Sequence, residues 1–466
     1  MYSFIICFLA LIASYFIYGK IIERTAGVDE NVETPVQRLE DGVDYAPISR
    51  IRGFLVQFLN IAGLGPIFGV IQGALFGPSA FLWITLGTIF VGATHDFFSG
   101  FLSMRNDGLT MPGIISKYLG TTVQKFVAVV TVITGVLVAA IFSTGSAALL
   151  ATLTSTPVFI WTSIIFIYFL IATVLPVDKI IGRLYPIFGI LFILMVILMT
   201  GGLLLNPGYT IPEFTTPGLY LTDKAIFPFL FVTIACGAIS GFHASQSPIV
   251  ARCITTEKDA RPVFFGAMVL EGLTALCWAA IALAFFHGQP QLGAIYAATP
   301  TVAIHEMATK LVGPIGLIIV ILGIVICPIT TGDTALRSSR ITMADELHIN
   351  QEKLLSRLKL AFPLFLAAYA LTFVDFTIVW RYVAWAQLII GVAVLLSATV
   401  YLMKKKKPYI ITLAPAIVCT LITFGYILQA PEGLKLPSMI ANVLSIILTI
   451  IVTVIFLKKH KKSNEG

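Results

Sequence analysis

The sequence has little charge. Of its 466 residues, only 11% are Asp, Glu, Lys or Arg, whereas 58% are hydrophobic. Because soluble globular domains carry about 25% charged residues, this composition excludes that class and predicts an all-α polytopic membrane protein. The net charge of +7 does not indicate a nucleic-acid partner, since the basic residues are confined to short segments between apolar runs.

The sequence also lacks the motifs of metal sites, disulfide frameworks and soluble enzymes. Its six cysteines lie in or beside apolar stretches, without a CxxC pair, so we expect free thiols, no zinc and no disulfides. There is no Walker A motif, and His305-Glu306 is not followed by the second histidine of a zinc-protease helix. We therefore expect no enzyme activity, no catalytic residues and no cofactor.

What the sequence does contain is a series of long apolar stretches. A membrane-spanning helix needs about 20 apolar residues, and the sequence predicts about thirteen such helices. The first has no basic segment and no small-residue cleavage site, so we expect a retained span rather than a cleaved signal peptide. The predicted spans lie near 2–19, 50–76, 79–104, 122–152, 157–176, 183–205, 225–250, 262–287, 312–336, 356–374, 377–402, 409–429 and 438–457.

The basic residues predict the orientation of these spans. Alternate connecting segments hold most of the Lys and Arg residues. The other connecting segments hold only Lys224, Lys310, Arg381 and Lys435. This asymmetry follows the positive-inside rule, and it predicts an amino terminus outside the cell membrane and a carboxyl terminus in the cytoplasm.

Two of the predicted spans are interrupted by glycine, one at 61–69 (Ile-Ala-Gly-Leu-Gly-Pro-Ile-Phe-Gly) and the other at 235–243 (Ala-Cys-Gly-Ala-Ile-Ser-Gly-Phe-His). A break frees backbone polar groups that lipid cannot satisfy, so it persists only where it lines a cavity or is buried in protein. Paired breaks in corresponding positions of two halves indicate a transporter's substrate site. Close packing of glycine-rich helix surfaces is the alternative interpretation.

The positions of the breaks also predict how the chain is divided. They are five spans apart and run in opposite directions, which predicts a 5+5 inverted repeat. We therefore expect an extra first helix with a polar cytoplasmic loop (1–49), a first five-helix repeat (50–205) and an external loop (206–224). A second five-helix repeat (225–402) and two extra helices with a basic tail (403–466) complete the chain.

Several motifs occur in an order typical of one family. They are Ile61-Ala-Gly-Leu-Gly-Pro-Ile67, Gly92-Ala-Thr-His-Asp-Phe97, Ser103-Met-Arg105, Cys236-Gly-Ala-Ile-Ser-Gly-Phe-His243, Glu271-Gly272 and Asp333-Thr-Ala-Leu-Arg337. In these motifs the chain resembles the carbon starvation protein A (CstA) family, a branch of the amino acid–polyamine–organocation transporter superfamily. The resemblance implies a leucine-transporter-like fold and the uptake of peptides or pyruvate, with proton-coupled symport for pyruvate.

The two breaks supply the expected substrate-binding groups. At the first, the N–H groups of Gly63, Leu64 and Gly65 begin the outer half-helix, whose partial positive charge favours a carboxylate. A simple kink is the alternative. At the second break, the expected substrate-binding residues are Gly237, Ser240, Gly241 and His243. The His243 imidazole can hold a proton or a substrate carboxylate, and its alternative role is a neutral group bonded to a backbone carbonyl.

Ionisable side chains at membrane depth are functional candidates, because inserting one charge costs about 2.5–3.5 kcal/mol. His95 and Asp96 lie in the inner part of the third span, and Glu271 lies near the middle of the eighth. We expect these side chains to couple transport to an ion. The alternatives are a helix-end role for His95 and Asp96, and a permanently protonated Glu271 that bridges two helices.

A second group of polar residues ends the ninth span. By the resemblance, the inner half of that helix faces the first broken helix, where a sodium site is expected. Hydroxyl, carboxylate and carbonyl oxygens are suitable ligands for such a cation, and they come from Asn60, Thr330, Thr331, Asp333 and Thr334. A proton on Asp333 would serve the same role, and an ion pair between Asp333 and Arg337 is the structural alternative.

Together these patterns predict a secondary active transporter in the cell membrane. We expect an ion-coupled symporter that imports small carboxylate-bearing nutrients, peptides or pyruvate, during carbon starvation. The residues leave open the choice between H⁺ and Na⁺, the choice between pyruvate and peptide, and the oligomeric state. The alternative function is a membrane nutrient sensor that binds the same ligands without transporting them.

Overall fold

The computed structural model describes the chain except for residues 43, 175–176, 217–220, 287–299, 352 and 463–466. The described residues form helices and no β-strand, apart from one isolated bridge between Ile48 and Ile254. The predicted all-helical fold is therefore confirmed.

The described residues up to 205 form eleven α-helices. They are α1 (Tyr2–Phe16), α2 (Tyr18–Ala26), α3 (Pro35–Leu39), α4 (Arg50–Ile61), α5 (Val70–Gly73), α6 (Ser79–Leu86), α7 (Ala93–Met104), α8 (Met111–Leu119), α9 (Thr121–Thr154), α10 (Val158–Val174) and α11 (Val177–Leu205). Two π-helical turns, Gly65–Gly69 and Gly87–Gly92, and a 3₁₀ turn, Ala74–Phe76, lie between them.

The described residues after 205 continue in the same way. Their α-helices are α12 (Phe231–Thr233), α13 (Ala235–Ala238), α14 (His243–Ala251), α15 (Gly266–Phe286), α17 (Pro300–Leu347), α18 (Leu354–Leu371), α19 (Phe376–Lys404), α20 (Ile410–Gln429) and α21 (Ser438–Lys462). The π-helical turns Ile226–Leu230 and Arg261–Phe265 and the 3₁₀ turn Glu257–Asp259 connect them.

Each predicted span has a helical counterpart. Among the described residues, ten helices are long and apolar enough to cross a membrane, and two further helix pairs pass the same test together although each is bent at a short break. The shorter apolar helix Val158–Ala172 covers the predicted fifth span. The chain is thus a multi-pass membrane protein.

The two bent pairs coincide with the predicted broken helices. The segments Arg50–Ile61 and Gly65–Phe76 meet at 55°, and Ile226–Thr233 and Ala235–Ala251 meet at 62°. Glycine is required at both breaks because other backbones approach there. A Cβ on Gly65 would overlap the carbonyl of Cys236, and a Cβ on Gly241 would overlap the carbonyl of Gln387.

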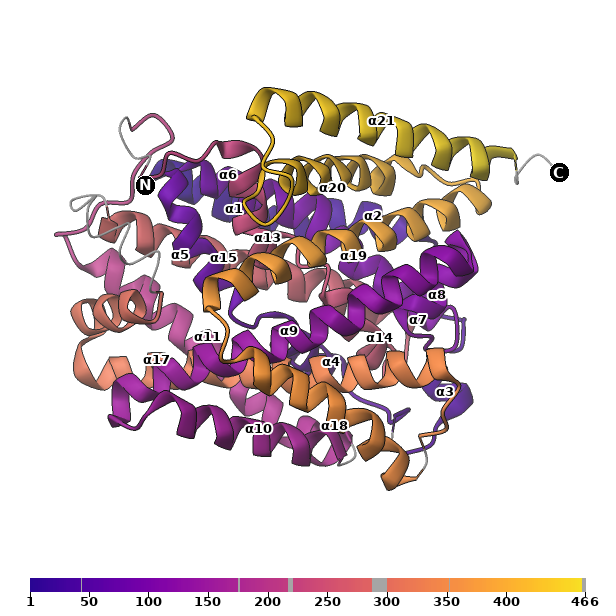
Figure 1. Ribbon diagram of the computed structural model, residues 1–466, viewed down its shortest axis with the longest axis horizontal. Helices are drawn as coiled ribbons and strands as arrows, with labels where there is room; N and C mark the ends of the chain where they lie inside the picture. The colour runs from indigo at the N-terminus through magenta and orange to yellow at the C-terminus, as the bar shows by residue number, and fades with distance from the viewer. Residues whose placement is uncertain (43, 175–176, 217–220, 287–299, 352, 463–466) are drawn as a thin grey trace.

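The remaining helices enclose these breaks. Helix α9 packs along α17, α11 packs against α17, and α19 packs against α20, which in turn packs against α21. Figure 1 shows α20 and α21 at one side of the bundle and α10 and α18 at the opposite side. Helices α1 and α21 expose large apolar side chains such as Ile6 and Met439, as helices that face lipid do.

Two predicted loops prove to be partly helical. The polar segment 20–49, predicted as a loop, contains most of α2 and all of α3. A capping box between Thr34 and Gln37 satisfies the first backbone groups of α3, which explains how so short a helix forms. In the predicted outer segment before the ninth span, α17 already begins at Pro300 and bends at Gly313, where φ is 69°.

The ninth span also extends further than predicted, because α17 continues to Leu347. Arg337 and Arg340, which the charge pattern placed in a cytoplasmic loop, therefore lie on this helix and are buried. Both guanidinium groups find oxygen acceptors: Arg337 donates to the carbonyl of Ala172, and Arg340 donates to the side chain of Gln351. These bonds compensate for the burial of the two charges.

Candidate functional site

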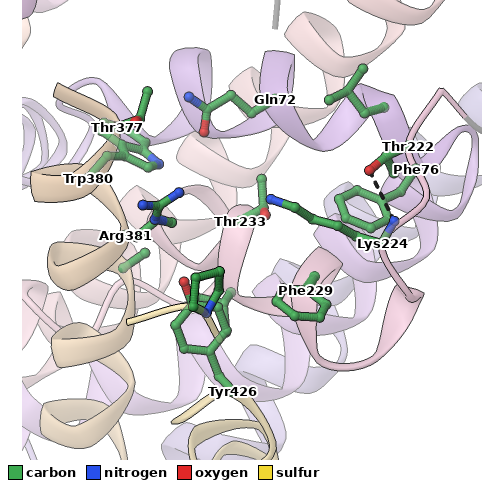
Figure 2. Close-up of a pocket in the computed structure, with 14 residues that line it drawn as sticks. Gln72, Phe76, Thr222, Lys224, Phe229, Thr233, Thr377, Trp380, Arg381 and Tyr426 are labelled. Carbon is green, nitrogen blue, oxygen red and sulfur yellow. Dashed lines mark hydrogen bonds between the residues drawn. The ribbon is translucent and has the colours of Figure 1, made fainter. Parts of the chain in front are cut away.

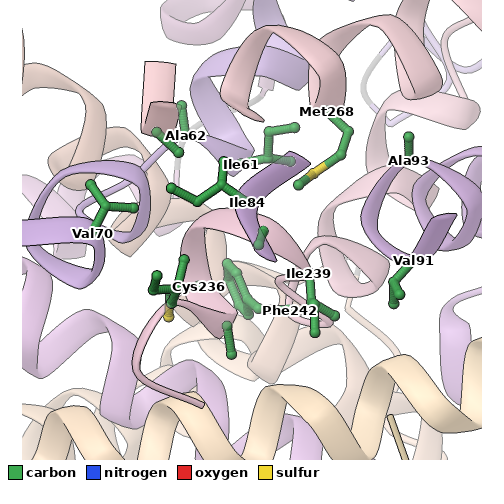
Figure 3. Close-up of a cluster of buried hydrophobic side chains, with 14 of the residues drawn as sticks. Ile61, Ala62, Val70, Ile84, Val91, Ala93, Cys236, Ile239, Phe242 and Met268 are labelled. Atoms are coloured by element: carbon green, nitrogen blue, oxygen red, sulfur yellow. The ribbon is translucent and has the colours of Figure 1, made fainter. Parts of the chain in front are cut away.

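The two breaks lie against each other in the interior of the bundle. Gly65 follows the first break, and the backbone of Cys236 in the second broken helix lies directly over it. Figure 3 shows apolar side chains of both breaks, including Ile61, Ile239 and Phe242, gathered with Met268 of α15. The breaks are therefore buried in protein rather than exposed to lipid, as an interrupted helix requires.

A cluster of four ionisable side chains lies beside the breaks. It contains His95 and Asp96 of α7, His243 of α14 and Glu271 of α15, and all four are fully buried. Nδ1 of His243 lies 2.9 Å from Oδ2 of Asp96, and Nε2 of His243 lies 3.3 Å from Oε2 of Glu271. Nδ1 of His95 lies 3.1 Å from Oδ1 of Asp96. The structure thus brings together four residues predicted separately from three spans.

Both imidazoles also contact a backbone carbonyl at a break. Nε2 of His243 lies 3.2 Å from the carbonyl oxygen of Ile61, at the end of α4. Nε2 of His95 contacts the carbonyl oxygen of Ile239, just after α13. A carbonyl can only accept a hydrogen bond, so each Nε2 carries a hydrogen when these bonds form. This fixes the tautomer of each neutral ring, with Nδ1 as the unprotonated nitrogen facing Asp96.

That tautomer requires an additional proton between His243 and Asp96. An unprotonated Nδ1 and an ionised carboxylate are both acceptors, and two acceptors 2.9 Å apart cannot form a hydrogen bond. The bond therefore contains one proton, carried either by the carboxyl of Asp96 or by an imidazolium at His243. The cluster is consequently a place where a proton is held within the membrane-spanning region.

Glu271 and Asp96 have side-chain oxygens that can still form hydrogen bonds in this cluster. Four side-chain atoms of the cluster have no hydrogen-bond partner within the described part of the chain. They are both carboxylate oxygens of Glu271, Nδ1 of His95 and Oδ1 of Asp96. Buried polar groups without partners are costly, and they mark positions where a proton, water or ligand is accommodated. The described residues contain no group of three or more His, Cys, Asp or Glu side chains arranged to hold a metal ion.

The glycines predicted to bind substrate lie at tightly packed positions. A Cβ on Gly63 would overlap the ring of Phe142 in α9, and a Cβ on Gly237 would lie 3.0 Å from Cα of Pro66. The carbonyl of Leu64 accepts the N–H of Phe68 at 2.8 Å, so the outer half-helix begins directly after Gly63-Leu64. Its amino end is therefore placed at the break, next to the second broken helix.

Ser240 leads to a residue that the sequence reasoning missed. Its hydroxyl donates to Oε1 of Gln387 at 3.1 Å, and Nε2 of Gln387 donates to Sγ of Cys236 at 3.0 Å. Gln387 lies on α19, and its backbone also passes Gly241. A lone amide in the middle of a long apolar span was the available signal, because a buried amide needs partners.

The predicted cation-binding residues meet in part. The hydroxyl of Thr331 on α17 donates to the carbonyl of Leu59 at 3.2 Å, next to Asn60 on α4. The hydroxyls of Thr330 and Thr334 bond mainly to carbonyls of their own helix. The side-chain polar atoms of Asn60 and Asp333 are buried and have no hydrogen-bond partner among the described residues. Arg337, the predicted partner of Asp333, donates to Ala172.

A cavity of about 270 Å³, which we call the vestibule, lies between segments 72–76 and 229–233 of the two broken helices, α19 and α20. The charged side chains that line it among the described residues are Lys224 and Arg381, which Figure 2 shows reaching into it from two sides. Nε of Arg381 lies 3.2 Å from Glu432, which also accepts the hydroxyl hydrogen of Tyr426. The sequence reasoning had noted both cations only as exceptions to the charge asymmetry.

Trp380 joins the vestibule to the first break. Its indole stacks on Phe376, with ring centroids 5.7 Å apart, and lies 6.3 Å from the ring of Phe68 in the π-helical turn after the break. The indole N–H is buried and has no hydrogen-bond partner among the described residues. Trp380, which lines the vestibule, thus belongs to an aromatic group that contacts the first broken helix.

The opposite end of the broken helices is tied together by ion pairs. Arg105, after α7, donates through Nη2 to Glu257 at 2.8 Å and to the carbonyl of Gly27 at 2.9 Å. Arg50, at the start of α4, donates to Asp259 at 2.5 Å. These bonds join four segments that are far apart in sequence, around Gly27, Arg50, Arg105 and 257–259.

Comparison with known proteins identifies a matching family model and a similar membrane protein. A family model described as carbon starvation protein CstA matches residues 1–160 and 144–316. An uncharacterized membrane protein of Haemophilus influenzae is 41% identical over 345 residues, which cover 63% of this chain and 93% of that protein.

Two relatives have names that state a function. The peptide transporter CstA of Bacillus subtilis is 28% identical over 333 residues, covering 58% of this chain and 55% of the relative. The pyruvate/proton symporter BtsT of Escherichia coli is 26% identical over 324 residues, covering 55% of this chain and 45% of the relative. The chain thus spans about half the length of these two relatives.

Solved structures show the same fold at low sequence identity. A crystal structure of a mutant manganese transporter from Eremococcus coleocola superposes with a TM-score of 0.59 and 12% identity, covering 91% of this chain and 99% of that one. At this identity the likeness concerns the arrangement of the helices alone.

Proposed function

The chain belongs to the carbon starvation protein CstA family, and we propose that it is a proton-coupled symporter that imports a small carboxylate-bearing nutrient. The observation that carries the proposal is the proton required between Asp96 and His243, 2.9 Å apart at the meeting point of the two breaks. The names of two relatives, a peptide transporter and a pyruvate/proton symporter, support transport of this kind.

The cluster is suited to coupling because several neighbouring groups can carry or accept its proton. His243 contacts both acids, and its Nε2–H can point to the carbonyl of Ile61 or to Glu271. A substrate carboxylate at the amino end of the outer half-helix, near Gly63, Leu64 and Gly65, would lie beside this cluster. Its negative charge would favour an added proton on the cluster, so substrate and proton would bind together.

Access from outside would pass through the vestibule. Lys224 and Arg381 would attract an anion into it, and Trp380 lines it and packs near Phe68, just after the first break. In the predicted orientation, the ion pair between Arg105 and Glu257 would lie at the cytoplasmic end and would form part of a gate there. Alternating access would come from rocking of one helical bundle against the other.

A sodium ion is the second candidate for coupling. The unpartnered polar atoms of Asn60 and Asp333 favour it, because oxygen ligands without partners suit a hard cation. The hydroxyls of Thr330 and Thr331, however, already donate to backbone carbonyls, although their oxygens can still accept a ligand bond. We therefore rank the proton first.

The test is uptake of labelled pyruvate and of a labelled dipeptide into proteoliposomes, under an imposed proton gradient and then a sodium gradient. Accumulation that follows the proton gradient is the expected result. Accumulation that follows only the sodium gradient would shift the coupling site to Asn60 and Asp333. Binding of either substrate without accumulation would overturn transport and favour the nutrient-sensor alternative.

A further inference from the structure

Three cavities adjoin one another on the side of the molecule formed by α1, α4, α11 and α15. The first has a volume of about 510 Å³ and lies at the ion-paired end. The second, of about 260 Å³, shares Tyr15 and Pro262 with the first, and the third, of about 370 Å³, shares Leu270 and Leu273 with the second. The shared lining residues place the three cavities one after another along α15, and we call this series the path.

The first cavity is basic. Four cations line it, from α2, α4 and the turn before α15: Arg24, Arg50, Lys258 and Arg261. Glu23 is the carboxylate that lines it among the described residues, and its Oε2 lies 3.2 Å from Nε of Arg261.

Two more of these cations form ion pairs with acids that do not line the cavity. Arg50 pairs with Asp259 and Lys258 pairs with Glu30, whereas Arg24 forms no ion pair within the described part of the chain. The cations lining the cavity therefore exceed its carboxylates. Nη1 of Arg261 is buried without a hydrogen-bond partner among the described residues, and its guanidinium lies 5.1 Å from the ring of Tyr15.

The second and third cavities are apolar. Ile12, Phe16 and Phe54 line the second, and Phe8, Ile193 and Val196 line the third. Leu273 follows Pro262 by eleven residues, which corresponds to a rise of about 16 Å at 1.5 Å per residue and matches one leaflet of a hydrocarbon core about 30 Å thick. The path therefore has a basic end and an apolar length of the dimensions of a lipid.

We propose that this path is a binding site for an anionic glycerophospholipid, with the phosphate among Arg24, Lys258 and Arg261 and an acyl chain in the apolar groove. Basic pockets at the ends of membrane helices bind anionic headgroups, and the arginine fork is suited to phosphate oxygens. A soluble phosphate ion would account for the cations but not for the groove. A zwitterionic lipid would account for the groove but not for the excess of cations.

The site goes beyond the proposed transport function, and it connects parts of the chain that differ in role. Arg24 follows the first helix, which lies outside the predicted repeat, whereas Arg50 begins the inner half of the first broken helix. A bound phosphate would hold the Arg24 segment to the turn before α15, which Asp259 already joins to Arg50. The lipid is thus expected to stabilise the ion-paired end of the molecule.

The first experiment is native mass spectrometry of the delipidated full chain. The protein is mixed with equal amounts of phosphatidylglycerol and phosphatidylethanolamine that carry the same acyl chains. We compare the ratio of lipid-bound to lipid-free protein at the collision energy that removes half of the phosphatidylethanolamine. We expect this ratio to be about tenfold higher for phosphatidylglycerol. Equal loss of both lipids would overturn the proposal, whether or not the protein transports any substrate.

Variants then locate the site. Arg24→Gln together with Arg261→Gln is expected to abolish the preference, whereas Lys405→Gln together with Lys407→Gln removes the same charge from an exposed segment and should keep it. Leu273→Trp fills the groove without changing charge and should reduce retention of both lipids. If the wild-type preference survives in the Arg24/Arg261 double variant, the site is wrongly placed.

A final arm separates a lipid from a free anion. Glycerol 3-phosphate and inorganic phosphate are added in excess, and thermal unfolding is followed in detergent. Phosphatidylglycerol is expected to raise the midpoint by several degrees, and the soluble phosphates should not. Stabilisation by the soluble phosphates alone would show an anion site and refute the lipid.

Discussion

The segments 50–205 and 225–402 supply the same kinds of side chain to the buried ionisable cluster, but their histidines make different contacts. The first supplies His95 and Asp96, and the second supplies His243 and Glu271, so each provides one imidazole and one carboxyl. His243 contacts both acids, whereas His95 contacts only Asp96. The difference follows from position, because His243 begins the helix that leaves a break and His95 lies on a span without one. We infer that His243 is the residue through which the two acids exchange a proton.

The two acids meet because corresponding spans place them at similar depth. Asp96 precedes the end of α7 at Met104 by eight residues, and Glu271 follows Pro262 near the start of its own span by nine. At 1.5 Å per residue, both lie about 12–14 Å from the same end of the bundle. Two spans of opposite direction thus bring their carboxyls to one level.

The largest expected effect compares the glycines of the two breaks. In Gly65→Ala the new Cβ would overlap the backbone carbonyl of Cys236, which cannot rotate away. In Gly237→Ala the new Cβ would lie 3.0 Å from Cα of Pro66, so a small shift can relieve the contact. Overpacking costs about 1–3 kcal/mol or more, so Gly65→Ala should lower the yield of folded protein and its unfolding midpoint more than Gly237→Ala. Equal midpoints, measured by thermal unfolding in detergent, would contradict the close contact.

The next prediction compares the two histidines. His243→Gln removes the group that contacts both acids, and unsatisfied buried polar groups cost about 1–3 kcal/mol each. We expect proton-driven uptake to fall at least about tenfold in His243→Gln and less in His95→Gln. Initial rates in proteoliposomes give the comparison, with counterflow as the control for a folded carrier. A larger loss in His95→Gln would reverse the roles assigned to the two rings.

Sequence patterns predicted most of this arrangement at the level of elements. The apolar stretches predicted the spans, and the glycine runs predicted the two bent pairs, because both signals are local properties of a helix in lipid. The contact between His243 and Asp96 could not be predicted, since residues on different spans have no fixed spacing. Gln387 is an isolated amide in an apolar span, which indicates that it needs partners, but the span does not identify Ser240 and Cys236 as those partners.

The same limit explains the buried arginines. The charge rule counts residues along the chain and assigns each Lys or Arg to a loop. The rule does not take into account that Arg337, on α17, donates a hydrogen bond to the carbonyl of Ala172 in another helix. A local pattern describes an isolated span, whereas the partner that stabilises a buried charge comes from another one.

The third prediction compares the two acids. Asp96 lies between both imidazoles, whereas Glu271 contacts only His243. Asp96→Asn and Glu271→Gln both keep the shape but cannot release a proton. We expect Asp96→Asn to abolish accumulation against a gradient but to retain the exchange of substrate at equal concentrations on both sides. We expect Glu271→Gln to lower accumulation only partly. Full concentrative uptake in Asp96→Asn would remove it from the coupling path.

The smallest expected effect concerns the vestibule, where the two segments again differ. The wall from the first segment contains Gln72 and apolar side chains, whereas the cations Lys224 and Arg381 come from outside it. Hydrogen bonds to charged groups contribute about 1.5–3 kcal/mol when desolvated and less at an open cavity. Lys224→Gln together with Arg381→Gln should therefore raise KM for an anionic substrate severalfold, with kcat nearly unchanged.

The matched controls decide whether this effect is electrostatic attraction into the vestibule. Lys435→Gln removes another cation from the same set of segments but does not line the cavity, so its KM should equal that of the wild type. Gln72→Ala alters the uncharged wall and should change KM less than the double variant. Because attraction between exposed charges is screened by salt, the KM difference should shrink between 10 mM and 500 mM ionic strength, a range over which the Debye length falls from about 30 Å to below 10 Å. A difference that persists at high salt would mean that the cations bind the substrate directly rather than attract it from solution.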